Sequence, residues 1–326
     1  MTLLDSEQSR MINDAVKGLV DSNEFLGVTT WPDPGAYSFQ GSNYGYTSGA
    51  AVDPTGTIDK FSFTSDGNAT DVGDLTSAKD GPAGQSSSTD GYASGGRNPP
   101  SVYLNTIDKF PFSSDTNAAD AADLTIGRSR AAGQSSSENG YSAGGITLPA
   151  TNVIDKFPFA TDTNATDVGD LISARQGAVG QSSSENGYTC GGGVPTVTNV
   201  IQKVPFSSDG NATDAADLTR STYLASGQSS TDNGYTSGGY LVSPNYSNII
   251  DKFPFASDTN AADVGDLTVA RFGLTGQSST VSGYASGGYT GASSNVIDKF
   301  PFSSDANATD VGNLTLARYY SAGQQY

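Results

Sequence analysis

The stretch from Val153 to Arg175, VIDKFPFATDTNATDVGDLISAR, decides the fold, because the chain carries six copies of it. The steps between successive copies of its fifth position, Phe157, are 49, 47, 47, 49 and 47 residues. The counterparts of Phe157 are Phe61, Phe110, Phe253 and Phe300, with Val204 taking its place once. This period predicts similar units stacked around one continuous core, in place of separate globular domains.

Two shorter motifs keep the same period. Gly-Gln-Ser-Ser recurs with its glutamine at Gln85, Gln134, Gln181, Gln228 and Gln277, and ends the chain as Gly-Gln-Gln at Gln324. Gly-Tyr-x-x-Gly-Gly recurs with its tyrosine at Tyr92, Tyr141, Tyr188, Tyr235 and Tyr284, and in a weaker form at Tyr46. The three motifs follow one another in a fixed order, so each unit of the array has the same internal plan.

Charge and composition exclude several classes of partner. The chain has 34 acidic and 16 basic side chains and no histidine, which gives a net charge of −18. An acidic surface repels nucleic acids and anionic lipids, so we expect neither as a partner. No apolar run reaches the roughly 20 residues that a spanning helix needs, so we expect no membrane insertion. Cys190 is the only cysteine and is expected to be buried, with intermolecular pairing as the alternative.

We interpret each unit of the array as four antiparallel strands. Residues 176–220 are taken as the example. Its expected strands are 178–183, 187–192, 199–206 and 216–219, and the Asn-Gly of residues 184–187 predicts a tight hairpin between the first two. Alternation in the copy at Val153 sends Asp155 and Phe157 to one side and Ile154 to the other. The proline of Phe-Pro-Phe removes a ladder donor, which suits a strand end. Four strands in about 47 residues match one propeller blade.

Closure of the ring has two candidate solutions. Six blades need six innermost strands, and the copies from Gln85 to Gln277 supply five of them. The sixth is either Tyr319 to Gln325 or Ala36 to Gly41. We favour the C-terminal segment because YYSAGQQ matches the other copies better. Residues 36–41 would then lead into the N-terminal arm or pair with a neighbouring molecule.

The repeat resembles a known family. A tyrosine strand ending in Gly-Gly, a variable loop, an apolar strand, a turn, Asp-Leu-Thr and then arginine is similar to the kelch repeat over residues 37–326. The resemblance implies an all-β, six-bladed propeller. The kelch tryptophan is missing, since Trp31 lies outside the array; Lys79 replaces the arginine in the first copy, and Arg220 is displaced in the fourth. The consensus sequence of the copies, FPF(S/A)SDxNA(T/A)DVGDLTxAR, is similar to that of kelch-like virion structural or tail-fibre proteins of marine tailed phages of the cyanophage type.

An N-terminal arm, residues 1–36, precedes the array. Its apolar residues fall on one face at helical spacing, and a short helix of this kind needs a surface that buries this face. These residues are Met11, Ile12, Ala15, Val16 and Leu19. The helix packs either on its own propeller or on another subunit, and Trp31 to Gly35 forms a turn-rich linker.

The chemistry of an enzyme is largely missing from the sequence. Without histidine, copper sites and the Ser-His-Asp or Cys-His arrangements are excluded, so we expect no catalysis and no cofactor. The loops typified by Asp66, Asn68 and Asp71 place oxygen ligands at alternate positions, as calcium loops do. We interpret them as turns fixed by Asp and Asn bonds to backbone amides, and predict no metal.

The loops diverge on one predicted face of the disc and stay uniform on the other. The divergent loops join the second strand to the third, and the fourth strand to the next blade, and they are rich in tyrosine and arginine. Their candidate binding residues are Arg97, Tyr103, Arg128, Arg130, Tyr223, Tyr240, Tyr246, Phe272, Tyr289, Tyr319 and Tyr320. Loops on a rigid scaffold concentrate binding residues, which favours a recognition face. The alternative is neutral divergence of loops that contact nothing.

The resemblance implies a non-enzymatic virion structural protein, in a tail fibre, baseplate or capsid surface. We expect it in the virus particle, held to other virion subunits by the N-terminal arm and presenting the divergent face to a host-surface glycan, a protein or another subunit. A homo-oligomer remains open. The alternative is a cellular or secreted kelch-type module that binds protein or carbohydrate.

Overall fold

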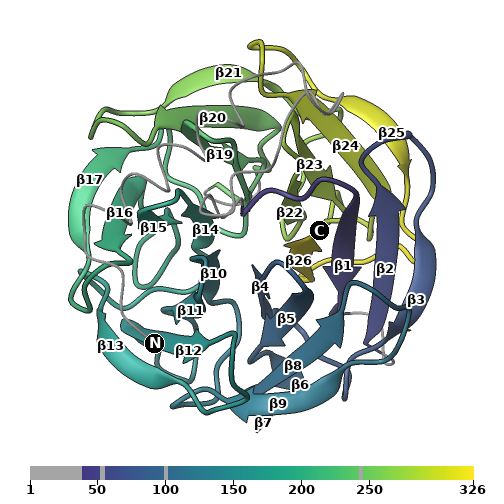
Figure 1. Ribbon diagram of the computed structural model, residues 1–326. Coiled ribbons are helices and arrows are strands. Elements are labelled where there is room, and N and C mark those ends of the chain that lie inside the picture. Colours follow the sequence, from purple (N-terminus) through teal and green to yellow (C-terminus); the bar gives the residue numbers. More distant parts are fainter. Residues whose placement is uncertain (1–38, 52–55, 99–101, 242–244) are drawn as a thin grey trace, which may run out of the picture. The chain divides into compact units, whose positions relative to one another are not determined.

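The computed structural model describes residues 39–51, 56–98, 102–241 and 245–326, which fall within the unit Tyr37–Tyr326. Six four-stranded antiparallel sheets are arranged around a central axis, so the predicted six-bladed propeller is confirmed (Figure 1). The described residues contain no helix, and hence none that could span a membrane. The expected N-terminal helix, with Met11, Ile12, Ala15, Val16 and Leu19, lies outside these residues.

The strands of each blade are given from the axis outward. Blade 1 consists of β26 (Ala322–Gln325), β1 (Tyr44–Ser48), β2 (Thr57–Ser62) and β3 (Thr70–Asp74). Blade 2 consists of β4 (Ala83–Ser86), β5 (Asp90–Ser94), β8 (Thr106–Pro111) and β9 (Ala119–Asp123), with a separate ribbon of β6 (Arg97–Asn98) and β7 (Val102–Tyr103). Blade 3 consists of β10 (Ala132–Ser135), β11 (Asn139–Ala143), β12 (Val153–Pro158) and β13 (Thr166–Asp170).

Blades 4 to 6 repeat this plan. Blade 4 consists of β14 (Val179–Ser182), β15 (Asn186–Cys190), β16 (Val200–Pro205) and β17 (Thr213–Asp217). Blade 5 consists of β18 (Ser226–Ser229), β19 (Asn233–Ser237), β20 (Ile249–Pro254) and β21 (Ala262–Asp266). Blade 6 consists of β22 (Thr275–Ser278), β23 (Ser282–Ser286), β24 (Val296–Pro301) and β25 (Thr309–Asn313).

The ring closes through its C-terminus, as predicted. β26 pairs antiparallel with β1, with Gln324 opposite Tyr46, so the first blade joins both ends of the described chain (Figure 1). The described part of the competing segment, residues 39–41, does not supply an inner strand. Instead, Gly41 forms a single parallel bridge with Ser279 of blade 6, so this part of the chain pairs within its own molecule.

Two details of the blade differ from the sequence prediction. The outer strand β17 spans Thr213–Asp217, not 216–219, because Asn211 accepts a hydrogen bond from the amide of Asp170 in the preceding blade and starts the strand early. The predicted Asn-Gly turn lies inside β15, and the hairpin is closed by Ser183 and Asn186 instead. The glycine after Asn186 has a packing role, because a Cβ at Gly187 would lie 3.0 Å from the ring of Phe206.

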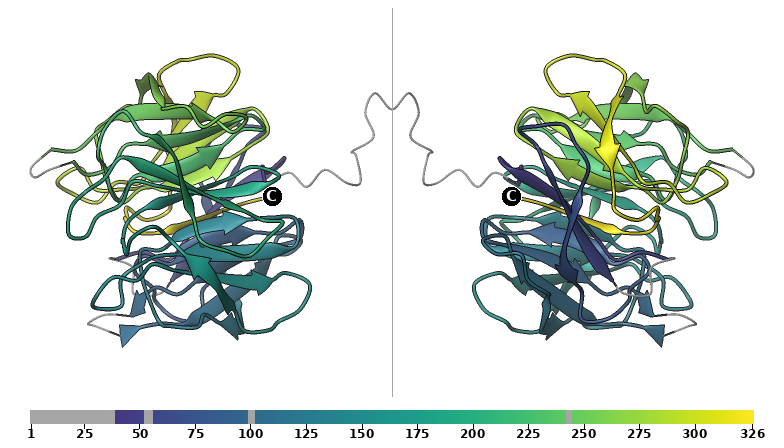
Figure 2. Two further views of the ribbon diagram at one scale, coloured as in Figure 1. Left: turned by 90° about the vertical axis from the view of Figure 1, so that its left-hand side faces the viewer. Right: turned by 90° about the vertical axis from the view of Figure 1, so that its right-hand side faces the viewer.

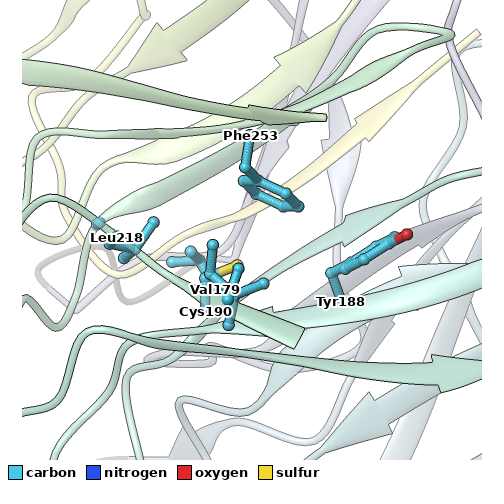
Figure 3. Packing of buried hydrophobic residues seen from close by; sticks show 8 residues of the cluster. Val179, Tyr188, Cys190, Leu218 and Phe253 are labelled. Atoms are coloured by element: carbon cyan, nitrogen blue, oxygen red, sulfur yellow. The ribbon is translucent and has the colours of Figure 1, made fainter. Parts of the chain in front are cut away.

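The hydrophobic core lies between neighbouring blades. In one cluster Val179, Tyr188 and Cys190 of blade 4 are buried together with Phe253 of blade 5 (Figure 3). The predicted alternation is confirmed, since Phe157 packs toward blade 2 and Ile154 toward blade 4. Each strand that ends in Phe-Pro-Phe therefore contributes to two cores, and the prolines stand at the strand ends. The expected burial of Cys190 is also confirmed.

The inner strands approach one another so closely that only glycine fits. A Cβ at Gly180 would lie 2.0 Å from the carbonyl oxygen of Gly133, and the other inner-strand glycines have distances of 2.0–2.3 Å. The next residue, glutamine, donates its amide to a tyrosine carbonyl of the following blade, as Gln181 does to Tyr235. The closing strand β26 makes the same bond, since its Gln324 donates to Tyr92 of blade 2. The Gly-Gln motif thus fixes the spacing of the blades.

Buried ion pairs also join neighbouring blades. Arg128, which follows the outer strand of blade 2, pairs with Asp155 of blade 3, and both side chains are fully buried. The equivalent pairs are Lys79–Asp108, Arg220–Asp251, Arg271–Asp298 and Arg318–Asp59. Arg220 reaches its partner from a displaced position and bonds the carbonyl oxygens of Gly238 and Ile249. Lys79 and Arg220 depart from the pattern of the other copies but preserve the same contact.

The loops between the third and fourth strands, typified by Asp66, Asn68 and Asp71, also join neighbouring blades. They lie on the side of the disc opposite to the divergent loops. Asn68 accepts a hydrogen bond from the amide of Asn313, and Asp66 pairs with Lys299, both in the preceding blade. The same two contacts recur around the ring, while Asp71 accepts a hydrogen bond from the amide of Gly73. The turn-fixing role is therefore confirmed for Asp71, whereas Asp66 and Asn68 differ from the prediction because they bond residues of the neighbouring blade.

Candidate recognition face

The two sets of divergent loops meet on one side of the disc, which we call the variable face. In blades 2 to 6, a bridge joins the link that enters the blade to the loop between its second and third strands. The bridged pairs are Asp80 with Arg97, Ser129 with Ile146, Gln176 with Gly193, Tyr223 with Tyr240, and Phe272 with Tyr289. The hairpins and Asp-Asn loops lie on the other side, the uniform face, and Figure 2 shows the disc from two sides.

Aromatic residues occupy these bridged positions on one half of the variable face only. They form a continuous series of ring contacts, with centroids 4.7–5.4 Å apart from Tyr223 through Tyr240, Phe272, Tyr289 and Tyr319 to Tyr320. Tyr246 contacts Tyr240, Phe272 and Tyr289 at 5.1–6.5 Å. We call these seven residues the aromatic crescent. The sequence predicted them as candidates, and the structure brings them together.

The residues of the crescent are less exposed than the apolar residues in the loops of blades 2 to 4. Every ring of the crescent is partly buried. By contrast, Val102, Leu148 and Val194 in the loops of blades 2 to 4 are 61%, 73% and 41% exposed. A groove of about 400 Å³ lies where the two regions meet, between Val194 and Tyr223.

A closed circle of backbone hydrogen bonds surrounds the axis at the mouth of the variable face. Each of its six residues donates its amide to the carbonyl of the equivalent residue in the preceding link, at 2.7–2.8 Å. All six have a φ between 57° and 66°. They are Gly81, Arg130, Gly177, Leu224, Gly273 and Tyr320. We call this circle the axial ring.

Glycine alternates with a large residue around the axial ring, because there is no room for six side chains. A Cβ at Gly81 would lie 2.9 Å from Cγ of Arg130, and one at Gly273 would lie 2.8 Å from the Tyr320 ring. The guanidinium of Arg130 lies 4.3 Å from the centroid of the Tyr320 ring. Burial raises the pKa of Tyr320 to about 12, with the charge of Arg130 acting in the opposite direction.

Three of the predicted site residues lie apart from the crescent. Arg128 is buried in its ion pair with Asp155, so it belongs to a blade interface and not to the surface. Arg97 pairs with Asp80, which places an ion pair where blades 5 and 6 have aromatic pairs. Tyr103 lies in the ribbon of blade 2.

Sequence reasoning missed the axial ring and the inter-blade ion pairs. The ion pairs could have been inferred from two matching exceptions in the repeat. The aspartate of Ile-Asp-Lys-Phe is replaced only in the fourth copy, by Gln202. The threonine of Asp-Leu-Thr is replaced only in the third copy, by Ile172. Elsewhere that threonine bonds the acid, as Thr125 does with Asp155. The alternation of glycine with large residues in the axial ring was also visible, but its geometry was not. Leu224 was missed for this reason.

Fold and surface together define a six-bladed β-propeller with one uniform face and one diverged, aromatic face. In comparisons with known proteins, no family profile matches the chain, and no curated protein is similar to it in sequence.

Proposed function

We propose that this chain is a non-enzymatic structural protein of a virus particle, in a tail fibre, a baseplate or the capsid surface. Its kelch-type propeller presents the variable face to a host surface or to another virion subunit. The observation that carries the proposal is the contrast between the faces: equivalent positions keep one pattern on the uniform face and gather the aromatic crescent on the variable face. Binding residues concentrate on loops held by a rigid scaffold.

The use of the ionisable side chains supports a non-enzymatic role. The buried carboxylates, such as Asp59 and Asp298, are paired with arginines across blade interfaces. The lysines of the third strands pair with aspartates of the next blade, as Lys60 does with Asp115. These groups are engaged in joining blades, which supports a role in presentation of a surface.

The described chain starts at the uniform face. Phe39, the first described residue, is buried at the mouth of the uniform face, where Gln40 donates to the carbonyl of Ser229. The expected arm residues Met11, Ile12, Val16 and Leu19 lie outside the described residues, and we propose that they hold the chain to another virion subunit.

A cellular or secreted kelch-type interaction module is the second candidate. The glycine pair that ends the second strand favours the kelch type in any setting. Both glycines have positive φ, as at Gly95 (68°) and Gly96 (104°), and a Cβ at Gly95 would lie 2.5 Å from the carbonyl oxygen of Arg128. This feature concerns the repeat and not the virus particle.

Two experiments test the proposal. Mass spectrometry and immunogold labelling of purified virus particles should detect the chain in them, and its absence would favour the cellular or secreted module. Particles that carry Tyr240→Ala together with Tyr289→Ala should adsorb to cells at least tenfold more slowly, because the crescent loses two rings. A matched double variant on the uniform face, Glu138→Ala with Glu185→Ala, should adsorb normally. Equal adsorption of all three would count against recognition through the variable face.

A further inference from the structure

Arg130 is a cation of the variable face that the fold does not use. The guanidinium of Arg130 makes a ring contact with Tyr320 and has no carboxylate partner among the described residues. By contrast, Arg97 pairs with Asp80. Arg128 and Arg318 are buried, and each forms an ion pair with an aspartate of the next blade. Five N–H donors in a planar fork are therefore held at the mouth of the axis without an acceptor of opposite charge.

The backbone at this position does not require arginine. Three of the six equivalent residues are glycine, and the others are Leu224 and Tyr320. Arg130 has φ 57°, which is an unfavourable region for a residue with a side chain. A strained residue of a type that its siblings do not share points to a function, because stability alone would favour glycine there.

A cavity of about 130 Å³ lies at the axis beside Arg130, and its walls are the starts of the six inner strands. The axial ring forms its rim, and the inner-strand glycines, such as Gly84 and Gly133, narrow its floor. This volume exceeds the space of a single water many times but is smaller than the pockets of drug-sized ligands. The cavity therefore has room for one small group of a larger ligand.

Local charge on the variable face admits an anion in spite of the net charge of the chain. Within the described loops of this face the only acidic side chain is Asp80, which is 2% exposed and paired with Arg97. The exposed carboxylates lie in the hairpins and loops of the uniform face, such as Asp66 and Glu138, and along the outer strands. Screening by salt weakens their effect across the disc.

One end of the aromatic crescent is Tyr320. The aromatic ring of Tyr320 contacts the guanidinium of Arg130 and also the ring of Tyr319. A ligand whose charged group enters the cavity would thus meet aromatic rings with its adjoining atoms. Sugar rings have apolar C–H faces that can lie on aromatic rings, while their hydroxyls remain in water.

We propose that Arg130 binds the carboxylate of an acidic sugar residue, of the uronic acid type, at the mouth of the axis, with the sugar ring against Tyr320 and Tyr319. The guanidinium fork matches a carboxylate with two parallel hydrogen bonds. The site rests on the proposed function in that it names the group of a host-surface glycan that the variable face recognises.

The test measures binding of trigalacturonic acid and of its methyl ester to the full chain by calorimetry. The two probes differ in charge and share the same sugar rings. The acid should bind at least tenfold more tightly than the ester. Arg130→Leu should lower the affinity for the acid at least tenfold and leave that for the ester unchanged. This substitution places in one link the residue that Leu224 already supplies in another, so the fold should be kept; equal melting temperatures of the variant and the parent would verify this.

Three results would overturn the inference. They are no binding of trigalacturonic acid at millimolar concentration, equal affinities for acid and ester, or binding of N-acetyl-triglycine as tight as that of the acid, which would show recognition of any carboxylate. The proposed function is tested separately by adsorption of particles. If Arg130→Leu abolishes binding of the acid but particles with this variant adsorb normally, the sugar site stands and its role in attachment fails. Loss of the chain from purified particles would leave the binding result unaffected.

Discussion

Arg318 forms an ion pair with Asp59, although the two residues stand near opposite ends of the described chain. This pair joins blades 6 and 1, at the seam where the ring closes. It is equivalent to the pair of Arg128 and Asp155, which joins two blades within the array. Both partners at the seam are fully buried, and Thr315 donates two further hydrogen bonds to Asp59. The seam is thus held by the same chemistry as the other interfaces, in addition to the pairing of β26 with β1.

Replacement of Arg318 by leucine should therefore destabilise the propeller strongly. The variant leaves the carboxylate of Asp59 buried without its cation, which costs about 3–5 kcal/mol in comparable cases. Urea unfolding followed by circular dichroism measures the loss. Lys60→Ala is the control, because it removes an exposed pair with Asp115 and should cost less than about 1 kcal/mol. Similar losses in both variants would contradict a special role for the buried pair.

The inner-strand glycines should not tolerate a methyl group. Gly180→Ala places a Cβ 2.0 Å from the carbonyl oxygen of Gly133, so backbone must move, and we expect a loss of more than about 2 kcal/mol. At Gly210 nothing lies within 4 Å of an added Cβ. Gly210→Ala, at a position where Ala306 stands in blade 6, should change the unfolding free energy by less than about 0.5 kcal/mol. A tolerant Gly180 would show that the blades can move apart.

One blade interface should be open to improvement. Arg175 is buried and bonds Ser173 and the carbonyl of Gly191, but the acid of the other interfaces is replaced by Gln202. Burial lowers the pKa of Arg175, and among the described residues no carboxylate of the next blade takes the place of the acid at this interface. The double variant Ile172→Thr with Gln202→Asp restores the pattern and should raise the unfolding free energy by about 1–3 kcal/mol.

Ile172→Thr alone serves as the control for that variant, because it restores the threonine hydroxyl without the carboxylate. We expect little gain from it in urea unfolding. A double variant no more stable than the single one would mean that Arg175 is already satisfied by its neutral partners.

Alkaline pH should unfold the propeller through its core tyrosines. Burial raises the pKa of Tyr141, Tyr188 and Tyr235 to about 12, against 10.0 for a free phenol. The folded state holds these protons more tightly than the unfolded state, so the stabilisation is complete below pH 10 and is lost as the pH rises from 10 to about 12. Circular dichroism should show unfolding in this window, coincident with phenolate absorbance at 295 nm. Titration of all tyrosines near pH 10 with intact circular dichroism would contradict the burial argument.

The sequence by itself determined the number of blades, the four-stranded plan and the separation of uniform and divergent loops, and it favoured the C-terminal segment as the closing strand. These features repeat every 47 to 49 residues, so a local pattern such as Val153 to Arg175 was observed six times and its exceptions stood out. The repeat did not determine where the strands begin and end. Asn186-Gly187 gave a turn signal, but the glycine is required by a packed aromatic ring, which a local motif does not reveal.

Only the tertiary structure decided which residues share a site. It buried Arg128 against Asp155, gathered Tyr223 and Tyr319 into one crescent, and set Arg130 over the ring of Tyr320. The physical reason is that a closed ring brings equivalent positions of all six units to one axis, at distances fixed by the glycines of the inner strands. The repeat tells which residues are equivalent, but the curvature of the ring decides which side chains meet, and where they lack room.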